Sequence, residues 1–91
     1  TIEAHIARAG AGGRIHSFQL ADWTTPLPAG VLTGRGQLGD GVVDFRWFRE
    51  KVEATGFAGP IEIEIFNDDM WSRDGQEMLT QTVARFREHA L

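Results

Sequence analysis

Hydrophobic and polar residues alternate in the middle of the chain, where residues 60–66 have the sequence PIEIEIF. A β-strand has a side-chain period of two, so the isoleucines share one face and Glu62, Glu64 and Phe66 share the other. The isoleucine face suits burial beneath helices. The glutamate face has two interpretations. It lies in water, as in a half-solvated strand, or it is enclosed by a covered parallel sheet and needs a cation or hydrogen-bond donors.

A second strand is predicted at residues 14–21. Phe18 and Leu20 share one face of it, and Gln19 lies on the other face among small and polar residues. This second face predicts a polar interior rather than an apolar one. Trp23 lies in the segment that leaves the strand, and its ring is suited either to stacking on a ligand or to capping the edge of the core.

Apolar residues at helical spacing predict three helices. The last turns of one helix precede the glycines at 10–13, an amphipathic helix runs from Asp44 to Gly56, and a final helix carries apolar residues from Met78 and ends near His89. The helices and strands alternate, which predicts an α/β fold with a right-handed βαβ unit and parallel strands. We expect a single, partial domain over residues 1–91.

Two segments lack periodicity and are predicted to be loops. Residues 26–41 are rich in proline and glycine, and loops of such length in a compact domain are usually functional or mobile. Its Gly-Arg-Gly at 34–36 and Gly-Asp-Gly at 39–41 could bring backbone N–H groups near an anion, although a plain turn explains them equally well. Residues 67–74 are predicted to form a second irregular loop.

Composition excludes several classes of function. The net charge of −4 argues against general electrostatic binding to nucleic acid or to an anionic membrane. The chain has no cysteine, which is compatible with a reducing cytoplasm, and no apolar run approaches the roughly 20 residues of a membrane span. It begins at Thr1 without an initiator methionine, so we expect a processed or truncated piece.

Two parallel strands are too few for a stable sheet, and the pattern fits better as the closing part of a (β/α)8 barrel. Several short motifs in order support this: FQLADW at 18–23, GDGVVD at 39–44, GPIEIEIF at 59–66, and Trp71 before the last helix. With these motifs the chain resembles the C-terminal part of the xylose-isomerase-like TIM-barrel superfamily of sugar and sugar-phosphate isomerases and epimerases. The resemblance implies that the parallel βαβα unit forms the last two strands and helices of that barrel.

The resemblance also implies a divalent metal at the C-terminal mouth of the barrel, held in the family by Glu, Asp, His and Glu from successive strands. The last glutamate falls on Glu64, and the histidine falls on Gln19, which departs from the family pattern. An amide oxygen suits a hard cation such as Mn²⁺ or Mg²⁺ better than a transition metal that prefers imidazole. Glu62 lies deeper along the strand, and we expect it to be an internal hydrogen-bonding partner.

The implied reaction moves a proton at a carbon next to a carbonyl, through an enediolate. By resemblance, Glu64 is a ligand and a candidate acid/base carboxylate, and Trp71 forms a wall beside the apolar face of the sugar. Trp23 is a second candidate substrate contact. Arg35 and Arg73 are candidates for contact with a hydroxyl or a phosphate.

The sequence thus predicts the C-terminal fragment of a metal-dependent isomerase or epimerase, inactive alone because half of the ligand set is missing. The alternative is a non-catalytic α/β module that persists by self-association, since both of its strands have unpaired edges. A third possibility, the apurinic endonucleases of the same superfamily, conflicts with the negative charge and the three poorly placed histidines. The expected partners are a small sugar and either a second copy or the missing N-terminal barrel portion.

Overall fold

The computed structural model describes residues 1–26 and 32–91 of the chain. The described elements, in chain order, are α1 (Ile2–Ala11), β1 (Phe18–Leu20), α2 (Phe45–Glu53), β2 (Ile61–Ile63), α3 (Asp68–Trp71) and α4 (Gly75–His89). Part of the predicted loop at 26–41, including Pro28 and Gly30, lies outside the described residues. Among the helices that the structure describes, none has both the length and the apolar composition of a membrane-spanning segment.

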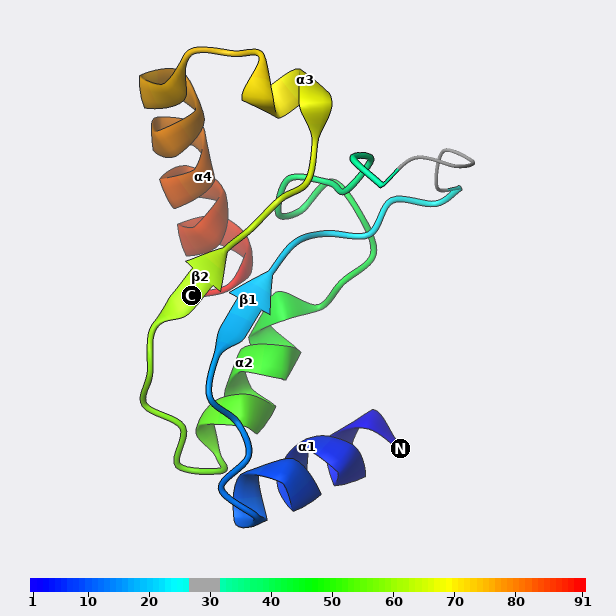
Figure 1. The fold of residues 1–91 in the computed structure, drawn as a ribbon, viewed down its shortest axis with the longest axis vertical. Coiled ribbons are helices and arrows are strands. Elements are labelled where there is room, and N and C mark those ends of the chain that lie inside the picture. Colours follow the sequence, from blue (N-terminus) through cyan, green and yellow to red (C-terminus); the bar gives the residue numbers. More distant parts are fainter. Residues whose placement is uncertain (27–31) are drawn as a thin grey trace.

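The two strands pair in parallel, as the sequence predicts (Figure 1). Gln19 lies opposite Glu62 in the register, and the Glu64 amide donates to the Leu20 carbonyl at 3.1 Å. Both strands are shorter than predicted: β1 begins at Phe18 rather than at residue 14, and beyond the C-terminal ends of both strands the backbone changes partners. Asp22 forms an antiparallel bridge with Gly36, and the chain after β2 forms another with the same loop.

The hydrophobic core lies on one face of this small sheet. Its buried members come from β1, α2, the loop before α2 and the end of α4, and they are Leu20, Leu38, Phe45 and Ala90. Phe18, Ile61 and Ile63 pack against them from the strands. The predicted apolar strand face is therefore confirmed: it packs against the helices, and the polar side chains occupy the opposite face.

Side chains with short polar groups cap the helices that follow each strand. The Asp44 carboxylate accepts from the Trp47 amide at 3.0 Å and begins α2, as the sequence predicts. The prediction of an irregular loop at 67–74 is wrong in part, because the Asn67 side chain accepts from the Met70 amide at 2.9 Å and begins α3. A helix of four residues is too short to show a hydrophobic period.

Leu38 provides a test of the core, because its side chain is fully buried although it lies in a loop. We expect Leu38→Ala to lower the free energy of unfolding by about 2–5 kcal/mol, the usual cost of a cavity. Leu32→Ala is the matched control, since Leu32 is 67% exposed and its truncation should change stability by less than about 0.5 kcal/mol. Urea unfolding followed by circular dichroism measures both, and equal effects would contradict this account of the core.

Candidate functional site

The polar face of the sheet carries Gln19, Glu62 and Glu64, and all three residues are exposed in the described structure. The Gln19 amide nitrogen donates to a Glu62 carboxylate oxygen at 3.0 Å, so Glu62 is a hydrogen-bonding partner as predicted, although it is exposed rather than internal. Of the two interpretations of the glutamate face, the described residues favour the one in which it faces water. No helix among them covers that face.

The loops that follow the C-terminal ends of both strands surround a polar pocket of about 330 Å³. Its charged lining residues are Arg35, Asp40, Asp69 and Arg73. Figure 1 shows that these loops leave the arrowheads of β1 and β2 on the same side of the molecule. The C-terminal ends of parallel strands are the usual location of active sites in α/β folds, so this pocket is the candidate substrate site.

Arg35 has the most closely defined position in this pocket. Its guanidinium carbon lies 4.7 Å from the centroid of the Trp23 ring, a distance typical of a cation–π contact. Its backbone amide donates to the Phe66 carbonyl at 3.0 Å, and its carbonyl accepts from the Asn67 side chain at 2.8 Å. Arg35 is thus attached to the segment after β2 and packs against Trp23 in the segment after β1.

The other candidate substrate contacts are arranged differently. Arg73 is in the pocket, but its guanidinium pairs with Asp69 at 2.9 Å, which offsets its charge. Trp71 is 59% exposed and its ring packs near Phe66, with centroids 5.7 Å apart. The structure therefore brings Trp23 and Arg35 together and places Trp71 at α3, outside the lining of this pocket.

Asp22 supports the loop that lines the pocket, and the sequence did not point to this role. Its side chain is 1% exposed, and its two carboxylate oxygens accept hydrogen bonds from four backbone amides. Three of these amides belong to residues 39–43, the start of the segment that leads into α2. The sequence feature that could have indicated this role is an acidic residue at the end of an apolar strand, with a Gly-Asp-Gly turn later in the chain.

The predicted metal ligands, Gln19 and Glu64, lie on the same face of the sheet on adjacent strands. The Gln19 amide nitrogen is used by Glu62, which leaves the amide oxygen available to a hard cation. No group of three or more histidine, aspartate or glutamate side chains in the described ranges is arranged to hold a metal ion. The two oxygen donors fit part of a ligand set for Mg²⁺ or Mn²⁺, and the other ligands would have to come from elsewhere.

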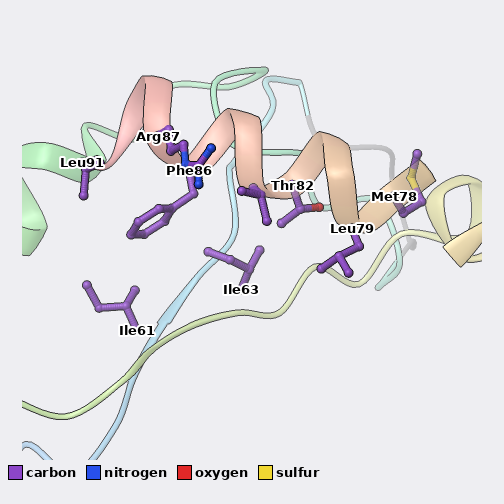
Figure 2. A pocket seen from close by; sticks show the side chains of 9 residues that line it. Ile61, Ile63, Met78, Leu79, Thr82, Phe86, Arg87 and Leu91 are labelled. Carbon is purple, nitrogen blue, oxygen red and sulfur yellow. The ribbon is translucent and has the colours of Figure 1, made fainter. Parts of the chain in front are cut away.

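A second, apolar cavity of about 640 Å³ lies between β2 and α4 (Figure 2). Ile61 and Ile63 face it from the strand, and Leu79 and Phe86 face it from the helix. Leu79 is 59% exposed, and its neighbour on the helix surface, Val83, is 41% exposed. This apolar groove is open in the structure and lies beside β2, whose outer edge pairs with no other strand among the described residues.

Comparison with known proteins identifies a family and a similar solved structure. The family model described as "Xylose isomerase-like TIM barrel" matches residues 2–88. The crystal structure of protein SMc04130 from Sinorhizobium meliloti 1021 is similar, with a TM-score of 0.91 and 39% sequence identity, over 98% of this chain and 32% of that one. This chain thus spans about a third of the length of that protein. No curated protein matches it.

Gly41 tests the packing of the loop around Asp22. A Cβ atom at this position would overlap the Trp23 carbonyl and the Asp22 carboxylate. We expect Gly41→Ala to lower the free energy of unfolding by about 1–3 kcal/mol, because backbone and carboxylate must both move. Gly75→Ala is the control, since Gly75 has open space around it at the start of α4, and thermal unfolding should show no loss of stability there.

Proposed function

Because this chain belongs to the xylose isomerase-like TIM-barrel family, we propose that it forms the last two βα units of a (β/α)8 barrel. We propose further that this barrel is a divalent-metal-dependent sugar or sugar-phosphate isomerase or epimerase. The observation that carries the proposal is the placement of Gln19 and Glu64 on the uncovered polar face of two parallel strands. In a barrel, that face would point inward, toward the mouth where active sites form.

The shape of the chain supports its place in a barrel. Helices pack against only one face of its sheet, and β2 has no neighbour on its outer edge within the described structure. A closed barrel of about 250 residues would pair that edge with its first strand. The apolar groove beside Ile61 and Ile63 would then be covered by the first βα unit, which accounts for its exposed apolar residues.

The chain's own residues have separate tasks in the proposed reaction. Glu64 and Gln19 would hold the cation through oxygen atoms, and the Glu64 carboxylate would also exchange a proton with the carbon next to the carbonyl. When bound, the cation supplies Lewis-acid stabilisation to the oxygen on which negative charge develops. Glu62 orients the Gln19 amide through its hydrogen bond at 3.0 Å.

We assign substrate binding to the polar pocket. Its lining includes neither Gln19 nor Glu64, so the reacting end of the substrate would have to extend from the pocket to the polar face of the sheet. The pocket volume of about 330 Å³ suits a small sugar, and the polar lining suits hydroxyl groups. Arg35 would bind a hydroxyl or a phosphate of the substrate, with Trp23 as the surface on which it packs. Arg73 is the weaker candidate because Asp69 already pairs with it, and Trp71 lies outside the lining of this pocket, so it would contact only a substrate that extends beyond the pocket.

Glu64→Gln tests the proposal in the complete barrel that contains this chain. Loss of the charged ligand should weaken Mn²⁺ binding, measured by calorimetry, by more than ~100-fold, and it should lower the turnover of aldose and ketose substrates by a similar factor. The reason is that even mutations of residues around the metal ligands lower metal affinity or activity by about 10–100-fold. Glu77→Gln is the matched control, because Glu77 lies in the first turn of α4 and outside the polar pocket. Unchanged turnover in Glu64→Gln would remove this carboxylate from the mechanism.

The apolar groove favours a second candidate function, in which the chain acts as a self-associating module without catalysis. The cavity of about 640 Å³ is open and has exposed leucine and valine side chains. Exposure of such apolar surface to water is unfavourable, and association with a partner would bury it. The free edge of β2 beside it could also pair with the same edge of a second copy.

Sedimentation of the 91-residue chain distinguishes this second candidate. We expect concentration-dependent association that Val83→Lys abolishes, because it places a charge in the groove. Ala84→Lys is the matched control on the next residue of α4, which is exposed and outside the groove lining. A folded monomer at every concentration would reject self-association and leave the barrel as the remaining explanation of the groove.

A further inference from the structure

We propose that Asp22 is a positioning residue that holds Arg35 against the Trp23 ring at the C-terminal ends of the strands. Asp22 touches neither the polar pocket nor the polar face of the sheet, so it would act only through these neighbours. The relevance of this role to catalysis rests on the proposed function, in which Arg35 contacts the substrate. The positioning itself rests on geometry alone.

The Asp22 carboxylate has a complete set of partners. One oxygen accepts from the amides of Trp23 at 2.8 Å and Val43 at 3.1 Å. The other accepts from the amides of Gly39 at 2.9 Å and Gly41 at 2.8 Å. A carboxylate has room for about four such bonds, and a buried one that makes them is held in a single orientation.

The connection from Asp22 to Arg35 runs through the main chain of Asp22. Asp22 and Gly36 exchange two hydrogen bonds, each 3.0 Å long, and Gly36 is the residue directly after Arg35. Trp23 is the residue directly after Asp22, and its amide is one of the four donors. Both members of the cation–π contact are therefore next to a group that Asp22 binds. The carboxylate binds the Trp23 amide directly, and the Asp22 main chain binds Gly36, while the carboxylate also binds the later part of the same loop at residues 39–43.

A rival explanation assigns the position of this loop to α4. The Gln37 side chain donates to the Thr82 hydroxyl at 3.0 Å, and Arg85 donates to the Leu38 carbonyl at 3.1 Å. Arg85 also pairs with Asp40 at 2.9 Å. If these contacts alone fixed the loop, Asp22 would be redundant for the position of Arg35.

Asp22→Asn separates the two explanations because asparagine has nearly the same shape. Each carboxylate oxygen faces two amide donors, so the NH₂ group of asparagine must face one such pair in either orientation. At least two hydrogen bonds are lost, and the asparagine NH₂ group then faces two backbone N–H groups. Asp40→Asn is the matched control: it weakens the contact with Arg85, on a side chain that is 49% exposed.

The experiment is nuclear magnetic resonance of the chain without metal or sugar. The ring current of Trp23 should shift the Arg35 side-chain protons, and Trp23→Leu defines how much of the shift that ring causes. We expect Asp22→Asn to remove more than half of this shift and to raise amide exchange at Gly39 and Gly41 by about tenfold or more. Asp40→Asn should leave the shift and both exchange rates close to those of the parent chain.

A folded Asp22→Asn chain that keeps the full Arg35 shift would overturn the proposal, and so would an equal loss in Asp40→Asn. If Asp22→Asn fails to fold, Gly41→Ala serves in its place, because the added Cβ displaces both the Asp22 carboxylate and the Trp23 carbonyl without removing either. Retention of the shift in folded Gly41→Ala would equally overturn the proposal. The measurement needs no turnover, so its failure leaves the proposed enzyme standing, and an inactive barrel leaves a positive result intact.

Discussion

The parallel pairing of β1 with β2 is the constraint on which the other features depend. It places Gln19 opposite Glu62 and gives both strands the same direction, so their apolar side chains meet α2 and α4 on one face. The same pairing brings both C-terminal strand ends to one side, where the loops enclose the polar pocket. An antiparallel pair would separate those loops to opposite ends and leave no common site.

Most of the fold could be predicted because its signals are local. Alternation placed the strands and their two faces, and the cap at Asp44 placed the start of α2. The strand ends could not be predicted, since Asp22 and Asn67 change partners to a loop distant in sequence. Helix α3 was missed because four residues give no period, and only the Asn67 cap indicates it.

The candidate site was predictable in part for the same reason. Strand parity located Gln19 and Glu64 on the polar face, and the structure places them there. The contact of Arg35 with Trp23 depends on the folding of a glycine-rich loop back onto the strand ends, which no pattern encodes. Asp22 was overlooked because the sequence alone does not distinguish a buried aspartate that binds backbone amides from one that faces water.

All four partners of the Asp22 carboxylate are main-chain amides, and this has an evolutionary consequence. These four contacts use no side chain of the loop, and they require that Gly41 has none. Residues such as Arg35 and Asp40 could then diverge between related proteins while the frame beneath them persists. A family can in this way acquire new ligand preferences by exchanging a few loop side chains, with no need to rebuild the scaffold that presents them.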